Sequence, residues 1–173
     1  MDGDMASDRS TVIQALLADM LRVGNLVLPR IGERFATELG ASLVELNLLA
    51  ELKHSPEGKL RMSEISDKLT ISTTSVTRIV DGLERRGYAK RVLSRGDRRV
   101  VYAALTEEGA ELLTRAHPVS GPTLEENFGR HFATSEMAEM RTLLSRVLDG
   151  ASGASAESAR ASGSSPEPDS SGA

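Results

Sequence analysis

The sequence predicts a mainly α-helical protein with one small β-hairpin, on the basis of three observations. Apolar residues recur at helical spacing through most of the chain. Two short β-prone runs, 88–93 and 99–105, flank a turn that contains Gly96. The length of 173 residues allows one domain with a substantial core and is too short for two domains that each have such a core.

The first expected helix covers residues 10–39 and ends at Gly40. Pro29 lies inside it, and we expect it to kink the helix or split it in two, because proline removes a backbone donor. The apolar positions that predict this helix are Val12, Ile13, Leu16, Leu17, Met20, Leu21, Leu26, Val27, Ile31, Phe35 and Leu39.

Three shorter helices are expected to follow. Ser42 and Glu45 form a capping-box pattern that opens the first of them, which stops at the turn composition of residues 54–58. Ser63 is placed to cap a short helix over 64–69, and Ser72 to cap another that Gly87 ends. The last of the three carries one narrow apolar stripe: Val76, Ile79, Val80 and Leu83.

The C-terminal part is also predicted to be helical. Thr106, followed by two glutamates, opens a helix that reaches to about residue 132, and the helix dipole favours acids in that first turn. We expect Pro118, Gly121 and Pro122 to interrupt it. A last amphipathic helix is expected over residues 135–149.

A short helix, a tight turn, a second helix and a hairpin together make a winged helix-turn-helix domain, here over residues 41–105. Residues 10–40 and 106–149 then form a helical dimerisation arm, because their broad apolar faces exceed what so small a domain can cover. Residues 1–9 are polar, and 151–173 hold no apolar side chain larger than alanine, so we expect both ends to be disordered.

Charge is distributed unevenly along the chain. The whole chain carries −4, whereas residues 72–102 hold eight basic and three acidic side chains, a balance of +5. An acidic body with one basic face is the electrostatic outline of a site-specific DNA-binding protein. A solvated charged surface without a ligand is the alternative interpretation of charge alone.

The helix capped by Ser72 has a polar face that fits a DNA major groove. If its apolar stripe packs inward, Thr73, Thr74, Thr77, Arg78 and Asp81 point away from the core. Threonine methyl groups contact thymine methyls, hydroxyls bond phosphates or base edges, and arginine pairs bidentately with guanine. An exposed polar helix face without a function is the alternative. The candidate DNA-binding residues of this helix are Ser72, Thr73, Thr74, Thr77 and Arg78.

The hairpin tip gathers Arg95, Arg98 and Arg99 around Gly96 and Asp97. A wing of this shape can lay an arginine into the minor groove, where the negative potential is enhanced. Asp97 has the wrong charge for a phosphate contact, so we expect it to orient an arginine through a charge-assisted hydrogen bond. The alternative is that Asp97 is an ordinary turn residue. The candidate wing residues are Arg95, Asp97, Arg98 and Arg99.

Residues 62–109 resemble the MarR family, the multiple antibiotic resistance regulators. The matching text is Met62-Ser63-Glu64-Ile65 with Leu69, STTSVTRIVDGLERR with Gly87, Gly96-Asp97-Arg98-Arg99, and Leu105-Thr106-Glu107-Glu108-Gly109. Four such motifs in order and at family spacing are a specific signal. The family often has glycine where this chain has Thr70, and a β-branched residue tolerates a positive φ poorly, so we expect an altered or strained turn there.

This resemblance implies an obligate homodimer, roughly triangular, whose first and last two helices intertwine. It implies that Thr73, Thr74, Thr77 and Arg78 enter the major groove of double-stranded DNA, and that Arg99, set by Asp97, enters the minor groove. An isologous dimer predicts a near-palindromic operator with half-sites about one helical turn apart. The function so predicted is a transcriptional regulator, and we expect a repressor. Members of the family often bind small aromatic acids, which release them from DNA.

The effector site implied by the resemblance lies between the arm and the winged domain. Arg22, Arg30, Arg34 and His117 are groups that can pair with a carboxylate, and solvated surface groups or ion pairs in the dimer are the alternative for each. We therefore assign no effector-binding residue from the sequence.

Several other functions are disfavoured. The absence of cysteine excludes disulfides, thiolate sensing and cysteine-based zinc sites, and His54, His117 and His131 are far apart. No cofactor, metal or catalytic activity is predicted, since no nucleophile–base pair, phosphate loop or carboxylate dyad has a defensible spacing. The sequence has no apolar run of about 18 residues, and its N-terminus lacks the basic start and apolar centre of a signal peptide, so we expect a cytoplasmic protein without a membrane partner. A winged-helix module for protein–protein contact is the alternative function.

Overall fold

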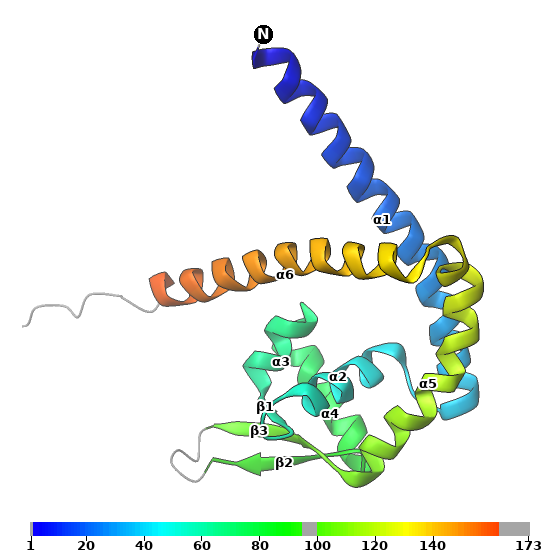
Figure 1. The fold of residues 1–173 in the computed structure, drawn as a ribbon. Helices are drawn as coiled ribbons and strands as arrows, with labels where there is room; N and C mark the ends of the chain where they lie inside the picture. Colours follow the sequence, from blue (N-terminus) through cyan, green and yellow to red (C-terminus); the bar gives the residue numbers. More distant parts are fainter. Residues whose placement is uncertain (1, 95–99, 163–173) are drawn as a thin grey trace, which may run out of the picture.

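The structure, a computed structural model, describes residues 2–94 and 100–162, with side chains over 8–94 and 100–150. A winged domain holds α2, β1, α3, α4, β2 and β3, and α1, α5 and α6 form an arm beside it (Figure 1). The predicted mainly helical fold with a small β-hairpin is confirmed. The elements are α1 (Asp2–Leu39), α2 (Leu43–His54), β1 (Lys59–Arg61), α3 (Met62–Leu69), α4 (Thr73–Arg85), β2 (Ala89–Leu93), β3 (Val101–Leu105), α5 (Glu107–Asn127), the short 3-10 helix η1 (Gly129–His131) and α6 (Thr134–Ser162).

The sheet has three antiparallel strands in the order β1-β3-β2. The predicted hairpin is present, with Val92 opposite Tyr102, and Ser94 N–H donates to the Val100 carbonyl at 3.0 Å where the two strands end. Strand β1 was not predicted, because three residues carry no periodic signal of their own. It forms because β3 offers it a free edge, on which Leu60 pairs with Ala103.

Two of the three serines that we predicted as N-caps cap a helix in the structure. Ser42 and Ser72 are the N-caps of α2 and α4, as predicted, and Glu45 completes the capping box of α2. The prediction for Ser63 is wrong, since α3 begins at Met62. The Glu64 carboxylate reaches back and accepts the Arg61 N–H at 2.7 Å, which satisfies a helix-start donor without a serine cap.

The prolines do not divide the long helices. The predicted interruption at Pro118 and Pro122 is wrong, because α5 runs unbroken through both. Both rings are exposed, so water can solvate the carbonyls that lose an N–H partner, and packing against α1 supports the helix. Helix α1 is likewise not split at Pro29, but its axis turns between its N-terminal part and the part beside α5 (Figure 1).

The two terminal helices extend beyond their expected limits. Helix α1 begins at Asp2 and α6 continues to Ser162, where we expected limits near residues 10 and 149. The disorder of residues 1–9 and 151–173 stays a prediction.

One buried cluster joins the winged domain to the arm. Its centre lies on α2, where Leu48, Leu49 and Leu52 are fully buried. The C-terminal part of α1 and the first half of α5 close the cluster on the arm side, so the winged domain and this part of the arm share a core. The other members are Val27, Ile31, Phe35, Ala41, Leu46, Leu60, Ile65, Val76, Val80, Leu83, Ala89, Ala103, Leu112, Ala116 and Val119.

The rest of the arm exposes apolar side chains. By length and hydropathy alone, the part of α1 from Asp8 to Leu39 is apolar enough to cross a membrane. Its opposite face, however, carries Gln14, Asp19, Arg22 and Asn25, whereas a membrane-spanning helix is apolar all round. The exposed apolar positions of α1 and α6 are Val12, Ile13, Leu16, Leu17, Met20, Leu21, Val23, Leu26, Leu28, Leu143, Leu144, Val147 and Leu148.

Candidate nucleic-acid interface

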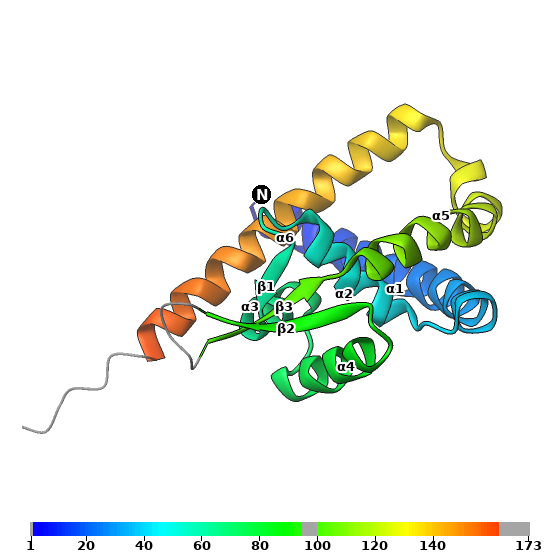
Figure 2. The ribbon, with the colours of Figure 1, turned by 90° about the horizontal axis from the view of Figure 1, so that it is seen from below.

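Helix α4 lies at the outer edge of the winged domain, on the side away from α6 (Figure 2). The stripe of Val76, Val80 and Leu83 is fully buried and Ile79 is partly buried, as predicted. The helix therefore turns its polar face to solvent. The exposed residues include every candidate of the sequence analysis on this helix: Ser72, Thr73, Thr74, Thr77 and Arg78.

The side chains of this face differ in which hydrogen-bonding groups remain available to a ligand. Ser72 Oγ accepts the Ser75 N–H at 3.2 Å, so its oxygen serves the helix cap. Thr77 Oγ1 donates to the Thr73 carbonyl at 3.0 Å, which leaves its methyl group and its lone pairs for a partner. Within the described residues, Arg78 makes no hydrogen bond or ion pair. Arg78 is therefore an unpaired cation beside the candidate threonines, as far as the described residues show.

The wing residues Arg95, Asp97, Arg98 and Arg99 lie outside the described residues. The stem of the wing is described, and Arg91 on β2 fastens it to α4. The Arg91 guanidinium pairs with the Asp81 carboxylate at 2.6 Å and with the Glu84 carboxylate at 2.6 Å. Asp81 thus supports the wing stem. This role of Arg91 was not predicted, because no local pattern connects β2 to the polar side of α4.

Glu84 binds Arg91 through backbone and side chain. The Arg91 N–H donates to Glu84 Oε1 at 3.0 Å. This bond is the main cause of the lowered pKa of Glu84, and the Arg91 guanidinium lowers that pKa further. Burial and the charge of Asp81 act in the opposite direction and raise it. The ionised form of Glu84 is therefore favoured, and α4 and the wing stem are joined through charged groups.

Thr106 and Gly109 form the junction between the wing and the arm. Thr106 Oγ1 caps α5 by accepting the Gly109 N–H at 3.1 Å, and it donates to the Gly87 carbonyl at 2.7 Å. A Cβ at Gly109 would lie 2.1 Å from the Tyr88 carbonyl oxygen, so only glycine fits there. The L-T-x-x-G motif thus has a structural cause in this chain.

The turn between α3 and α4 has the strain that Thr70 predicts. Thr70 has φ 54° and ψ 43°, and it is the only non-glycine residue with positive φ among those described. The turn is fixed on both sides, because the Ile71 N–H donates to the Ser66 carbonyl and Ser66 Oγ donates to the Ile71 carbonyl at 2.6 Å. The left-handed conformation is therefore imposed on a β-branched residue.

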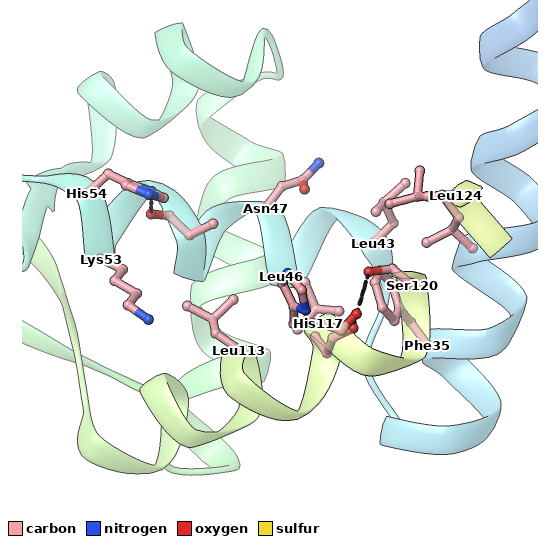
Figure 3. A pocket seen from close by; sticks show the side chains of 13 residues that line it. Phe35, Leu43, Leu46, Asn47, Lys53, His54, Leu113, His117, Ser120 and Leu124 are labelled. Carbon is pink, nitrogen blue, oxygen red and sulfur yellow. Dashed lines mark hydrogen bonds between the residues drawn. The ribbon is translucent and has the colours of Figure 1, made fainter. Parts of the chain in front are cut away.

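An open groove of about 490 Å³ lies between the arm and the winged domain. Its walls come from α1, α2 and α5, and Lys53, His54 and His117 bring polar nitrogen atoms to it (Figure 3). His54 Nδ1 is bonded to the Ala50 carbonyl at 2.7 Å, which leaves Nε2 for a ligand. The remaining lining residues are Ile31, Phe35, Leu43, Leu46, Asn47, Ala50, Leu113, Ala116, Ser120 and Leu124.

The groove contains only one of the four groups that the sequence offered for a carboxylate, His117. Arg22 pairs with Asp19, Arg30 donates to the Asn127 amide oxygen, and Arg34 pairs with Glu38 at 2.8 Å. Sequence reasoning missed Lys53 and His54. Their helical spacing from Leu46, Asn47 and Ala50 was a usable signal, because these positions share one face of α2.

The comparisons with known proteins agree on one family. The model of the MarR family matches residues 39–100. The chain is 38% identical to the HTH-type transcriptional regulator PapX of Escherichia coli over 101 residues, which are 58% of this chain and 60% of PapX. It is 33% identical to the HTH-type transcriptional regulator MhqR of Bacillus subtilis over 109 residues, 62% of this chain and 72% of MhqR. The chain thus spans less than two thirds of PapX.

The fold is similar to solved structures as well. Sco3205, a MarR family transcriptional regulator from Streptomyces coelicolor solved in complex with DNA, superposes with a TM-score of 0.69 at 23% identity. The match covers 79% of this chain and 86% of Sco3205. At that identity the likeness concerns the fold. The similarity to MhqR, to which the match of the family model adds, identifies this chain as a member of the MarR family.

Proposed function

We propose that the protein is a transcriptional regulator that binds double-stranded DNA as a homodimer on a near-palindromic operator. The observation that carries this proposal is the face of α4, where Thr73, Thr74, Thr77 and Arg78 are exposed together above a fully buried stripe. A helix with this division docks by its apolar side and offers its polar side to a groove. That Sco3205 is solved with DNA supports the same role for this fold.

In this proposal the α4 face reads the major groove. Arg78 pairs bidentately with a guanine edge, and the methyl groups of Thr73, Thr74 and Thr77 contact thymine methyls. Ser72 lies at the N-terminus of the helix, where the backbone N–H groups and the helix dipole favour a phosphate. The balance of +5 over residues 72–102 supplies the phosphate attraction that the acidic remainder of the chain lacks.

We assign the wing to the minor groove. Arg95, Arg98 and Arg99 gather positive charge at its tip, and Asp97 orients Arg99. The Arg91 bridge to Asp81 and Glu84 supports this arrangement, because it fixes the wing stem to the helix in the neighbouring groove.

Dimerisation is supported by the apolar surface of the arm. Leu16, Leu17 and Leu21 of α1 are each more than half exposed, and Val147 of α6 is 69% exposed. Burying one leucine side chain contributes roughly 1.5–3 kcal/mol, so a second copy that covers these faces has a large driving force. A dimer that occupies promoter DNA excludes other proteins from it, which is why we propose repression.

The groove between α1, α2 and α5 is the proposed effector site. Its apolar walls suit an aromatic ring, and Lys53, His54 and His117 suit a carboxylate, so the proposed ligand is a small aromatic acid. Because the groove is shared by the arm and the winged domain, a ligand with different affinity for two arrangements of these parts shifts DNA binding.

The test is Arg78→Ala on a duplex that the wild-type protein selects from a random pool. Loss of a bidentate base contact is expected to weaken binding by about 1–3 kcal/mol and to relax the preference at one base pair of each half-site. Arg115→Ala, an equal change of charge on α5, is the matched control and is expected to leave that preference intact. Unchanged affinity and sequence preference in Arg78→Ala would refute the major-groove assignment and favour a protein-interaction module.

A further inference from the structure

A single guanidinium at the C-terminal end of α4 connects three elements. Arg86 Nη1 donates to the Gly40 carbonyl at 2.8 Å, and Arg86 Nη2 pairs with Glu45 Oε1. Its Nε donates to the Gly82 carbonyl within α4 at 3.1 Å. The end of α1, the start of α2 and the end of α4 therefore meet at one side chain.

The carboxylate of Glu45 is shared between two of these elements. Its Oε2 accepts the Ser42 N–H at 2.8 Å, as part of the capping box of α2, while Oε1 binds Arg86. The Glu45 side chain is only 17% exposed. On the other side, the Arg86 guanidinium lies 5.4 Å from the centre of the Tyr88 ring, which limits its freedom further.

The planar guanidinium is what makes this three-way contact. It directs donors along fixed, diverging lines, whereas a lysine ammonium is a compact point charge. Gly40 has φ 63° and ends α1, which exposes more large apolar side chains than α5 or α6 among the described residues. The bond to its carbonyl thus links α4 to the point where the arm enters the winged domain.

We propose that Arg86 is a positioning residue that sets the angle of α4 to the arm, and thereby the half-site spacing that the dimer accepts. This inference rests on the proposed function, because spacing has a meaning only when two copies of α4 bind one duplex. In a symmetric dimer joined through its arms, any rotation of α4 against the arm is repeated in the second copy. The distance between the two reading helices therefore depends on this contact.

The contact is placed to control orientation more than stability. Arg86 is 34% exposed, and ion pairs at such positions contribute little to the free energy of folding. The attachment of α4 to the domain rests on Val76, Val80 and Leu83, all fully buried. A narrow apolar stripe allows small rotations that a directional bridge at the helix end prevents.

The experiment compares two duplexes. One is selected from a random pool by the wild-type protein, and the other has one base pair inserted between its half-sites. The measured quantity is the dissociation constant for the duplex with the insertion divided by that for the selected duplex. For Arg86→Gln we expect the ratio to fall by about tenfold, since α4 is released from the arm, with a melting temperature within about 4 °C of wild type.

Arg85→Gln is the matched control. It removes the same charge one residue earlier, and the Arg85 side chain has no partner among the described residues. We expect both dissociation constants to rise by one common factor and the ratio to stay unchanged. A ratio that Arg86→Gln leaves at the wild-type value, or that Arg85→Gln lowers equally, would overturn the proposal.

Glu45→Gln provides a second variant in case Arg86→Gln fails to fold. Glutamine can still accept the Ser42 N–H, so the cap of α2 is kept while the charge facing Arg86 is lost. The ratio is expected to fall in the same direction by a smaller factor, and an unchanged ratio contradicts the proposal. If the wild-type protein selects no duplex at all, the proposed function fails, and this inference fails with it.

Discussion

Gly109 and Tyr88 approach each other so closely that a Cβ at position 109 would lie 2.1 Å from the Tyr88 carbonyl oxygen. The two residues belong to α5 and to the start of the wing, and the Thr106 cap lies beside them. The junction between the arm and the winged domain therefore requires a residue without a side chain at position 109.

Gly109→Ala is accordingly expected to destabilise the protein by about 2–3 kcal/mol, because backbone atoms must move apart to admit the methyl group. Chemical denaturation measures this change. Gly32→Ala in α1 is the control, since its added Cβ meets no other side chain or distant backbone within 4 Å and no proline follows it. There alanine is expected to stabilise the helix by about 0.5–1 kcal/mol. Equal effects at the two positions would contradict the close approach.

Thr70→Gly is expected to stabilise the protein. Glycine adopts the left-handed conformation at φ 54° without strain, which removes a cost of about 1–2 kcal/mol from the folded state. Part of this gain is offset, because glycine also raises the conformational entropy of the unfolded chain. The net gain is about 0.5–1 kcal/mol in the free energy of unfolding. Thr70→Asn is expected to gain as well, since asparagine tolerates this conformation. A loss of stability in both variants would show that the turn is not strained.

The pairing of Glu84 with Arg91 predicts a pH dependence. The pKa of Glu84 is lower in the folded protein than in the unfolded chain. Its contribution to stability is therefore complete above the unfolded pKa and is lost as the pH falls through the folded one. The urea midpoint of Glu84→Gln is expected to lie below that of wild type at pH 7 and to approach it below about pH 4.

Glu111→Gln is the control for this measurement, because the Glu111 side chain has no partner among the described residues. A difference between Glu84→Gln and wild type that is constant with pH would argue against the ionised pair.

Leu16→Glu is expected to prevent dimerisation. Leu16 is 60% exposed in the single chain and lies in the apolar face of α1, so a carboxylate there opposes burial against a second copy. Sedimentation equilibrium measures the result, and Gln14→Glu on the opposite face of the same helix is the control. A Leu16→Glu protein that sediments as a dimer would place the interface elsewhere.

The features of α4 were predictable because they are local. The periodicity of Val76, Val80 and Leu83 fixes which face is buried, and Ser72 marks where the helix begins. The exposure of Thr73, Thr77 and Arg78 follows from these two facts. That they bind DNA stays a prediction.

Features that depend on distant contacts were not predictable. Strand β1 exists because β3 provides its edge, and α5 continues through Pro118 and Pro122 because α1 packs along it. Arg86 and Glu45 are 41 residues apart, and no periodic signal connects them. The groove likewise combines one face of α2 with two helices far away in sequence.

Binding of the purified protein to its own promoter region, across a salt series and against competitor DNA, tests the central claim most directly. We expect two protomers per site, an affinity that exceeds that for competitor DNA by about a thousandfold or more, and a steep fall with salt as counterions are released. Weak binding that is equal for all sequences, or binding by a single protomer, would contradict the account of a dimeric regulator that reads DNA with α4.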